Sequence, residues 1–327
     1  MQRRIAPFSD LLSLYRLTIY LRKNRPDIVH SLTPKGGMLG MLAAWIARVP
    51  IRIAMFNGEL KLPNRIVRGI VKITNWLTCL LATHLNADGY GTKEYVESQH
   101  ITRKPVVVFW HGNINGIDLK KFAPAGSRDK KRKILGISPT SIVFVFVGRV
   151  VHDKGIDELV PAFLTLVRQG ANARLLIIGK EEFKLDPISP ETKSLIDQSP
   201  EIMAVGMQSN IPEWLEVADV FVLPSHREGC NCSILEAAAM GLPSISSNIR
   251  GCNEVVQNGK TGILISSGNI QELSEAMFKL YAHKELRTTM GHQAREYAHT
   301  NYDRQDVWRE LRSFYRKISS TSQEIIQ

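Results

Sequence analysis

The sequence predicts an α/β protein of two doubly wound domains, each built from parallel strands that alternate with helices. The first observation is the alternation itself, because short apolar runs rich in Val, Ile and Phe recur between amphipathic segments. The second is length, since 327 residues are long for one core and sufficient for two domains. The third is a polar, charged stretch near the middle of the chain, after which the alternation starts again.

The first part of the chain carries the elements of one such domain. Ser9 can cap a helix that runs to about Asn24, since Pro26 follows and stops it. In order, we expect strands at 27–31, 51–55, 84–88 and 105–110, with helices at 38–47, 64–82 and 92–98. We assign residues 1–123 to this domain.

The second domain follows a predicted linker at 124–135, where PAGSRDKKRK is polar and charged and contains Pro and Gly. The alternation restarts with SIVFVFVGR (141–149), a continuous apolar run typical of a fully buried parallel strand. We assign 136–302 to this domain, with further strands at 174–180, 201–207, 219–225, 243–247 and 262–266, and helices at 156–169, 270–281 and 284–298. The C-terminal segment 303–327 contains a last helix, 305–318, which could return to the first domain, and a Ser/Thr-rich tail.

Composition and charge limit the class of protein. A hydrophobic content of 44% and a charged content of 22% indicate a folded chain rather than a disordered one. No run approaches the roughly 18 apolar residues that cross a bilayer, and we expect no signal peptide. The net charge of +11 lies entirely in residues 1–121, which hold 18 Lys and Arg residues against seven Asp and Glu residues. The first domain should therefore bind lipid headgroups, a lipid diphosphate or nucleic acid, unless its basic surface is merely solvated.

Four cysteines are present, and two of them, Cys230 and Cys232, form a Cys-x-Cys pair. This is not the usual zinc spacing, and no second Cys or His pair completes four ligands. In the absence of an export signal, we expect reduced thiols in the cytoplasm, with no metal site and no redox pair.

A pair of cations follows the buried strand at 141–149. Gly148 ends the strand, Arg149 comes next, and Lys154 precedes a helix whose tight entry Gly155 permits. A guanidinium fork and an ammonium beside a helix N-terminus form an anion site that suits a diphosphate. The alternative is that both cations are solvated.

Two carboxylates flank the cysteine pair in EGCNCSILE (228–236). Glu228 lies in the loop after the strand 219–225, and Glu236 lies about two turns inside a helix that starts near Asn231. A helical carboxylate can accept both hydroxyls of a ribose. Glu228, with the backbone amides of 229–233, can hold sugar hydroxyls and the second phosphate. The segment therefore predicts a sugar-nucleotide site.

This segment resembles the C-terminal domain of the family 4 retaining glycosyltransferases, whose signature is two glutamates separated by seven residues. LPSHREG, LEAAAMGLP, NIRGCNEVV and GKTGILI fit that family, and VGRVVHDKG matches its diphosphate-binding element. VHSLTPKGGMLGMLAAWIARVP (29–50) resembles the first domain of members that make capsular and lipid-linked polysaccharides, and HGNINGIDLKKFAP (111–124) resembles their inter-domain segment. The resemblance implies the GT-B fold, in which two Rossmann-like domains face each other.

The resemblance also implies the reaction and a role for each matching residue. A hexose would move, with retention, from a nucleotide-diphosphate sugar, expected to be a UDP-sugar, to a lipid-linked or polysaccharide acceptor, without a metal or cofactor. In the catalytic set, Arg149 and Lys154 would neutralise the leaving diphosphate and Glu228 would contact the donor sugar. Other donor contacts would come from Glu236 (the ribose), Gly148, Gly206, Met207, Gly229, Cys230, Asn231, Cys232 and Ser233, and acceptor contacts from Lys35 and Asn57.

Two departures from the family bear on activity. The chain starts at what would be the second or third helix, so the first domain is expected to lack its first strand–helix unit or units. Asn57 stands where many relatives have a histidine, and a carboxamide cannot act as a general base, although the departing phosphate can take the acceptor proton. The alternatives are a weakly active or inactive remnant and a sugar-nucleotide epimerase of the same architecture, against which the glutamate pair argues. A nucleic-acid binder lacks any known motif here.

The segment KLPNRIVRGIVKITNWL (61–77) predicts a basic amphipathic helix. Its apolar stripe contains Leu62, Ile66, Ile70, Ile73 and Leu77, and its basic stripe contains Lys61, Arg65, Arg68 and Lys72. Such a helix can lie on an anionic membrane, or it can pack on its own sheet with a solvated basic face. With the family resemblance, we expect a peripheral protein on the cytoplasmic face of the cell membrane, with a lipid-diphosphate-linked glycan acceptor and no nucleic-acid partner.

Overall fold

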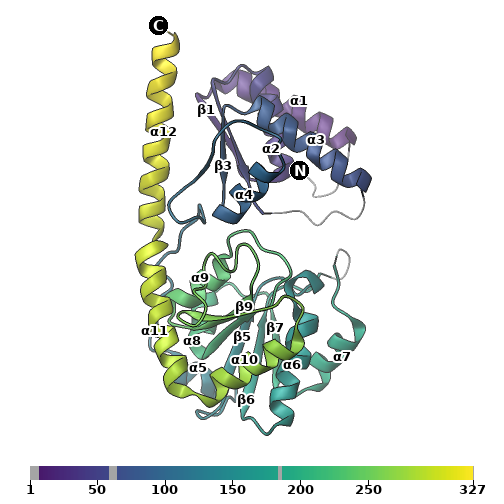
Figure 1. The fold of residues 1–327 in the computed structure, drawn as a ribbon, viewed down its shortest axis with the longest axis vertical. Helices are drawn as coiled ribbons and strands as arrows, with labels where there is room; N and C mark the ends of the chain where they lie inside the picture. Colours follow the sequence, from purple (N-terminus) through teal and green to yellow (C-terminus); the bar gives the residue numbers. More distant parts are fainter. Residues whose placement is uncertain (1–6, 59–64, 183–185, 327) are drawn as a thin grey trace. The chain divides into compact units, whose positions relative to one another are not determined.

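The chain forms two compact α/β units, each with a parallel sheet (Figure 1). The computed structural model describes residues 7–58, 65–182 and 186–326, without the side chains of residues 7, 34, 35 and 321–326. Unit 1 consists of Met1–Ile114 and Gln305–Gln327, and unit 2 consists of Asn115–Arg304.

Unit 2 contains a sheet of six parallel strands in the order β10-β9-β8-β5-β6-β7. The strands are β5 (Ile142–Val147), β6 (Ala173–Ile178), β7 (Ile202–Gly206), β8 (Val220–Leu223), β9 (Ser244–Ser247) and β10 (Gly262–Ile265). The order reverses between β5 and β8, the first and fourth strands of the unit. This is the Rossmann order, in which ligands bind beyond the carboxyl ends of the strands at the point of reversal.

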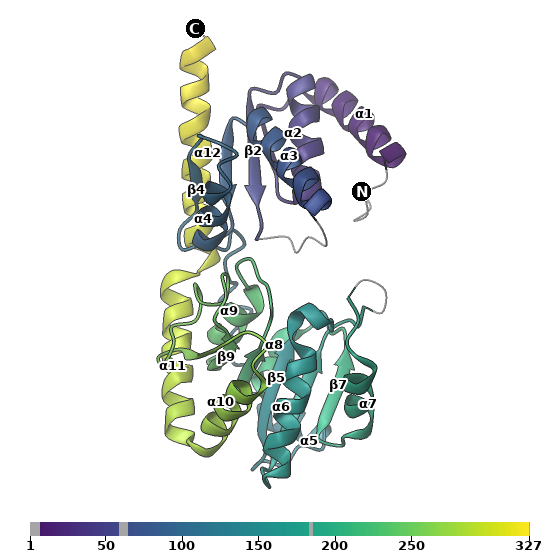
Figure 2. The ribbon, with the colours of Figure 1, turned by 45° about the vertical axis from the view of Figure 1, so that its right-hand side comes forward.

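Helices cover both faces of this sheet (Figure 2). They are α5 (Arg128–Ile134), α6 (Ile156–Arg168), α7 (Pro190–Gln198), α8 (Ile211–Val217), α9 (Cys232–Ala239), α10 (Ile270–Ala282) and α11 (Lys284–Asn301), with the short 3-10 turn η1 (His152–Lys154) before α6. α6 contacts α7 and α10, whereas α9 contacts α11 and α5 contacts α8.

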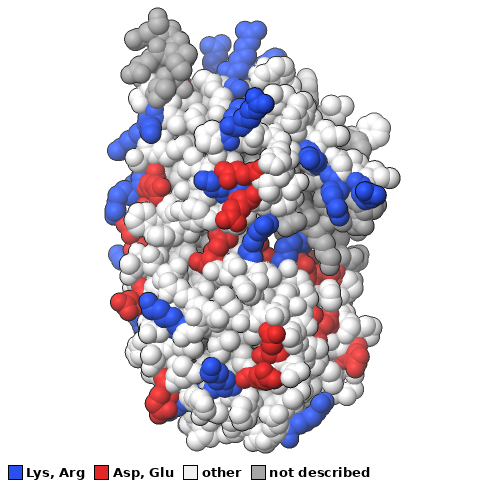
Figure 3. Space-filling model, in the orientation of Figure 1, with Lys and Arg blue, Asp and Glu red and all other residues white. Residues whose placement is uncertain are grey.

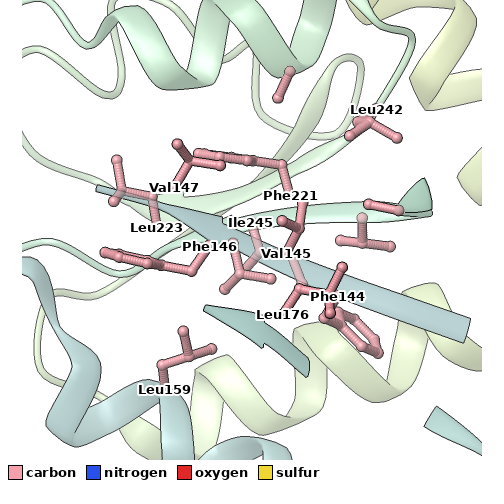
Figure 4. Close-up of a cluster of buried hydrophobic side chains, with 14 of the residues drawn as sticks. Phe144, Val145, Phe146, Val147, Leu159, Leu176, Phe221, Leu223, Leu242 and Ile245 are labelled. Atoms are coloured by element: carbon pink, nitrogen blue, oxygen red, sulfur yellow. The ribbon is translucent and has the colours of Figure 1, made fainter. Parts of the chain in front are cut away.

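The core of unit 2 is centred on β5. Figure 4 shows Phe146 and Leu159 on one side of this strand and Val147 and Phe221 on the other. A strand buried on both faces has no polar side to present, which is why its sequence is continuously apolar. Four of its side chains are completely buried: Val143, Phe144, Val145 and Phe146.

The boundary between the units lies earlier than the sequence predicted. Residues 115–123, assigned above to the first domain, belong to unit 2, because Ile117 and Phe122 are buried in its core. Gly116 also lies so close to Arg304 that a Cβ there would come within 2.3 Å of the Arg304 Cα. The Ile117 N–H donates to the Tyr302 carbonyl at 2.7 Å, which ties this segment to the end of α11.

The predicted linker at 124–135 is wrong, because its charged run forms α5 inside unit 2. Arg132 Nη2 and Arg128 Nη2 bond to the two carboxylate oxygens of Asp219, at 2.7 and 2.6 Å. Asp219 Oδ2 also accepts from the Val143 N–H at 2.8 Å. The charged residues of this segment therefore form a largely enclosed ion-pair network and do not form a solvent-exposed linker.

Unit 1 contains four parallel strands in the order β1-β2-β3-β4. They are β1 (Ile28–Ser31), β2 (Ile51–Phe56), β3 (His84–Ala87) and β4 (Val106–Val108). The sequence analysis expected a doubly wound order in this half also. The described strands instead follow the order of the chain, so the switch-point argument for a nucleotide site applies to unit 2 alone.

Helices also cover both faces of the unit 1 sheet. One face carries α1 (Pro7–Asn24), α2 (Pro34–Ile46), α3 (Arg65–Leu81) and α4 (Tyr90–Ser98), and α2 contacts both α1 and α3. The other face carries α12 (Arg304–Ile326), whose Ile318 packs on Ile51 and Ile53 of β2 (Figure 1). The helix continues to Ile326 without a Gly or Pro to end it, so the expected tail after residue 318 is wrong over 319–326.

A half-buried hydrogen-bond chain attaches α12 to this sheet. Tyr315 Oη lies 2.7 Å from His30 Nδ1, and His30 Nε2 lies 3.0 Å from Asn86 Oδ1. Because the Asn86 oxygen can only accept, His30 carries its proton on Nε2 and accepts from the Tyr315 hydroxyl through Nδ1. Burial lowers the pKa of His30, which favours this neutral form.

α3 presents its apolar stripe to solvent instead of to its own sheet. The exposed fractions are 75% for Ile66, 49% for Ile70 and 59% for Ile73. On the face shown in Figure 3, Lys and Arg side chains without neighbouring acids gather where Figure 1 places α3. The alternative in which this stripe packs on its own sheet therefore does not hold for these residues. Lys61 and Leu62 lie outside the described residues.

We expect Asp219→Asn to lower the free energy of unfolding of unit 2 by about 3 kcal/mol, because Arg132 would stay buried without its counter-charge. Urea denaturation measures this change. The same substitution at Asp306, which pairs with exposed Arg309 at 2.8 Å, is the matched control and should cost less than about 1 kcal/mol. Equal effects of the two variants would show that Asp219 does not anchor α5.

Candidate functional site at the switch point of unit 2

The candidate site lies at the carboxyl ends of β5 and β8, where the strand order reverses. The turn after β5 leads through η1 into α6, and the loop after β8 leads into α9. A Cβ on Gly155 would lie 2.1 Å from the Pro224 carbonyl oxygen, and Gly155 has a left-handed φ of +73°. Only glycine fits there, so this residue lets the two segments meet.

A second close approach joins the ends of β5 and β6. A Cβ on Gly179 would lie 1.6 Å from the Gly148 carbonyl oxygen, and the Gly179 N–H donates to the Gly206 carbonyl at 2.9 Å. The turns after β5, β6 and β7 therefore converge through backbone alone. Met207, expected above among the donor contacts, follows Gly206 and is 77% exposed.

Lys154 and Glu228 form a direct ion pair across the switch point. Lys154 Nζ lies 2.5 Å from Glu228 Oε1, and the side chains are only 15% and 7% exposed. Charges this enclosed remain ionised at tolerable cost only when they are paired. Both residues were predicted as separate donor contacts, and their mutual ion pair was not predicted.

Arg149 also has a carboxylate partner, but its side chain is 44% exposed. Its Nη1 lies 3.0 Å from Glu182 Oε2, in the turn after β6. Glu182 was not predicted, because the local sequence does not distinguish it from the adjacent Glu181 as a partner of Arg149. Since both expected diphosphate ligands already have carboxylate partners, an incoming diphosphate has to exchange with those carboxylates or share the cations with them.

The loop from Glu228 to Asn231 is shaped by Gly251. A Cβ on Gly251 would lie 1.4 Å from the Gly229 carbonyl oxygen, so the two segments are in backbone contact. Asn231 then caps α9, because its Oδ1 accepts from the Ile234 N–H at 3.0 Å. The predicted donor residues Gly229, Cys230, Cys232 and Ser233 thus follow Glu228 into the first turn of α9.

Three cysteines lie around this loop as ordinary thiols. Cys252 is buried, and burial raises the pKa of its thiol to about 12. Cys230 packs against the core of unit 2, and Cys232 Sγ accepts from the Asn115 amide at 3.8 Å. Across the ranges that the structure describes, no group of three or more His, Cys, Asp or Glu residues is placed to hold a metal ion.

Glu236 is the residue with the most perturbed carboxyl group of the predicted set. Burial in α9 raises its pKa to about 7, and the nearby charge of Lys121 opposes that shift. Hydroxyl groups that donate to the ionised carboxylate would stabilise it, as the two hydroxyls of a ribose can. Lys121 was missed because residues 115–123 had been assigned to the other domain.

Two stacked histidines connect the turn after β5 with the loop after β8. The rings of His152 and His226 lie 5.3 Å apart with 23° between their planes. His152 Nδ1 lies 2.7 Å from Asp157, and His226 Nε2 lies 2.9 Å from Glu158, both in the first turn of α6. The hydrogen bond with Asp157 raises the pKa of His152. Neither the stack nor its carboxylates were predicted.

The expected acceptor residues belong to unit 1. Asn57 follows β2, and its Nδ2 donates to the Leu32 carbonyl at 2.7 Å, which fixes the orientation of its amide. Lys35 lies in the first turn of α2, and its side chain is outside the described part. As far as the chain is described, no helix has the length and apolar character needed to cross a membrane.

These features define a class of protein. The chain is an α/β protein of two parallel units, and its Rossmann-ordered unit brings cations and carboxylates to the switch point, as nucleotide-binding enzymes do. Residues 127–297 match the family described as Glycosyl transferases group 1, and the chain belongs to that family. It is a glycosyltransferase with the GT-B fold.

Individual relatives agree with this assignment. The chain is 32% identical over 330 residues to the capsular polysaccharide biosynthesis glycosyltransferase CapM of Staphylococcus aureus, covering 99% of this chain and 85% of CapM. It is 32% identical over 296 residues to the Escherichia coli UDP-Gal:alpha-D-GlcNAc-diphosphoundecaprenol alpha-1,3-galactosyltransferase, covering 87% of this chain and 74% of that enzyme. The crystal structure of Anabaena HepE in complex with UDP has a TM-score of 0.79 at 19% identity, covering 94% of this chain and 82% of that one.

The pKa of Glu236 makes the stability of unit 2 depend on pH. The pKa is about 7 in the folded chain against 4.5 for an unperturbed glutamate, so the folded state binds more protons and loses stability as pH rises through this window. We expect Glu236→Gln to be more stable than the wild type by roughly 2–3 kcal/mol at pH 8 and equally stable at pH 4.5.

Urea denaturation at the two pH values tests this expectation. Glu285→Gln, which removes a carboxylate at an exposed position of α11, is measured beside it as the control. A Glu236→Gln effect of the same size at both pH values would mean that the carboxyl group does not titrate in this range.

Proposed function

We propose that this chain transfers a hexose with retention from a UDP-sugar to a lipid-diphosphate-linked glycan, in polysaccharide biosynthesis at the cytoplasmic face of the cell membrane. The observation that carries the proposal is the enclosed Lys154–Glu228 pair at the switch point, with Arg149 in the turn after β5 and Glu236 in α9. The Escherichia coli relative named for a UDP-sugar donor and a diphosphoundecaprenol acceptor supports the substrate classes.

The chemistry of the proposal uses residues of this chain without a metal or cofactor. The bond between sugar C1 and the diphosphate oxygen breaks, an acceptor hydroxyl oxygen bonds to C1 on the same face, and its proton passes to the departing phosphate. Arg149 and Lys154 stabilise the charge that builds on the diphosphate, the task that a metal ion performs in other transferases. Asn57 can orient a hydroxyl but cannot remove its proton.

Glu228 and Lys154 act as a matched pair in this proposal. When the diphosphate becomes a partner of Lys154, the Glu228 carboxylate is released to accept hydrogen bonds from hydroxyls of the donor sugar. The pair thus gives each of these two enclosed groups a partner until the donor arrives. Retention is read from the anomeric proton signal of the first-formed product, and an inverted linkage would contradict it.

Calorimetry on the full chain with UDP, GDP and ADP tests donor binding, and we expect UDP to bind. Arg149→Ala should weaken UDP binding by roughly 10- to 100-fold, because it removes a charge-assisted contact of about 1.5–3 kcal/mol. Uridine lacks the diphosphate, so its weaker binding should barely change. Arg168→Ala, at the far end of α6, is the control. If the wild type binds none of the three nucleotides, the donor assignment fails.

The membrane part of the proposal rests on α3 and on the charge of the first third of the chain. Three isoleucines of α3 face solvent, and residues 1–121 carry the whole excess of positive charge. An exposed apolar face beside basic residues suits the interface of an anionic bilayer. The acceptor named for the Escherichia coli relative is linked to diphosphoundecaprenol, which supports the same location.

Replacing Ile70 and Ile73 together by Ser should lower binding to phosphatidylglycerol vesicles about 30-fold, because it removes roughly 2 kcal/mol of apolar burial. Co-sedimentation measures the change, and added salt should weaken the binding of the wild type. Ile134→Ser, at a 74% exposed position of unit 2, is the matched control and should bind like the wild type. Equal binding of the Ile70/Ile73 variant would remove α3 from the contact.

A further inference from the structure

We propose that Asp153 and Arg227 position Lys154 and Glu228 for the donor. This inference rests on the proposed function and adds two residues that act through those two rather than on the donor itself. Asp153 Oδ2 lies 2.8 Å from Arg227 Nη2, so the two residues form a second ion pair between the turn after β5 and the loop after β8. This pair lies directly beside that of Lys154 with Glu228, because the two pairs join consecutive residues of the same segments.

The two segments meet as a ladder of three consecutive pairs, in which residues 152–154 lie against residues 226–228. The pairs are His152 with His226, Asp153 with Arg227, and Lys154 with Glu228. In both ion pairs, the acid of one segment faces the base of the other, so the four charges sum to zero. A shift of either segment by one residue would place like charges opposite each other, Asp153 against Glu228 or Lys154 against Arg227. The charges therefore fix the register of the ladder.

Asp153 is held from several directions. Its N–H donates to Asp186 Oδ2 at 2.8 Å, and its carbonyl accepts from the His226 N–H at 2.9 Å. Its side chain is 12% exposed, and its Oδ1 is buried with no hydrogen-bond partner among the described residues. An enclosed carboxylate with an unused oxygen is costly unless a cation compensates its charge. Asp153 therefore gives Arg227 a fixed place in the ladder.

Donor binding, as proposed above, opens one pair of the ladder. A diphosphate that becomes a partner of Lys154 separates this residue from Glu228, so this pair no longer links the two segments. The neighbouring pair of Asp153 with Arg227 can persist during the exchange, because these two residues are partners of each other. It then keeps Lys154 and Glu228 at the spacing at which one donor can contact both, with its diphosphate and with its sugar.

The alternative is that Asp153 and Arg227 act only through their charge near the diphosphate. Calorimetry with UDP on the full chain distinguishes the two cases, because they make opposite predictions for Asp153→Ala. If charge alone acts, loss of a nearby negative charge should tighten the binding of UDP. If the pair positions Lys154, its loss should weaken binding, and we expect a change of roughly tenfold, typical of residues that are coupled by direct contact.

The double variant Asp153→Ala/Arg227→Ala keeps the net charge, because it removes one charge of each sign. It also leaves neither partner buried without its counter-charge. We expect it to bind UDP roughly tenfold more weakly than the wild type, as each single variant does, because each substitution alone breaks the same pair. Arg227→Lys retains a cation for Asp153 and should restore most of the affinity that Arg227→Ala loses. Binding of uridine, which lacks the diphosphate, should change little in all four variants.

Lys131→Gln/Glu213→Gln is the matched control, because it removes an ion pair of 3.1 Å between α5 and α8 and should bind UDP like the wild type. Thermal unfolding checks that each variant is folded. Wild-type affinity for UDP in the double alanine variant, or tighter binding in Asp153→Ala, overturns the inference and leaves the proposed function intact. If the wild type itself does not bind UDP, the proposed function fails and this inference fails with it.

Discussion

The ion pair between Lys154 and Glu228 is the constraint on which the candidate site depends. It links the turn after β5 to the loop after β8, the two segments that flank the reversal of strand order. Gly155 removes the side chain that would hold these segments apart, and Gly251 lets the segment after β9 reach the Gly229 carbonyl in the same loop. The pair supplies attraction, and its enclosure makes each partner costly to remove alone. The effects of substituting the two residues should therefore not be additive. The ion pair also fixes the relative position of the two segments before the donor binds.

Local signals explain what the sequence could predict. The apolar run of β5 and the glycines at its end are adjacent in the chain, so the buried strand and the Arg149 and Lys154 positions could be inferred together. The contacts that were missed join residues far apart in sequence: Arg132 with Asp219, Arg149 with Glu182, and Lys121 with Glu236. Composition around Arg132 is that of a linker, and only folding brings Asp219 to it. The wrong boundary and the wrong linker have this one physical cause.

α3 shows the limit of periodicity in a different way. Its sequence gives an apolar stripe and a basic stripe, but not which of its faces the fold buries. The structure exposes Ile66, Ile70 and Ile73, and buries Thr78 and Cys79 near the end of the helix. A surface helix normally buries its most apolar face. With the isoleucines exposed, their burial does not contribute to the free energy of folding. An exposed apolar helix face of this kind marks a contact with a partner outside the chain. The proposed membrane contact therefore rests on which residues the fold leaves exposed, and not on hydropathy alone.

The distribution of compensated and uncompensated cations distinguishes the candidate donor site from α3. At the switch point, Lys154 and Arg149 each have a carboxylate partner, so their positive charge is already compensated before a diphosphate arrives. On α3, Arg68 and Lys72 have no carboxylate partner among the described residues, and the positive excess of residues 1–121 is left to attract anions over distance. Screening acts mainly on such exposed, uncompensated charge. Salt should therefore weaken membrane binding steeply, whereas donor binding at the charge-compensated switch point should respond less.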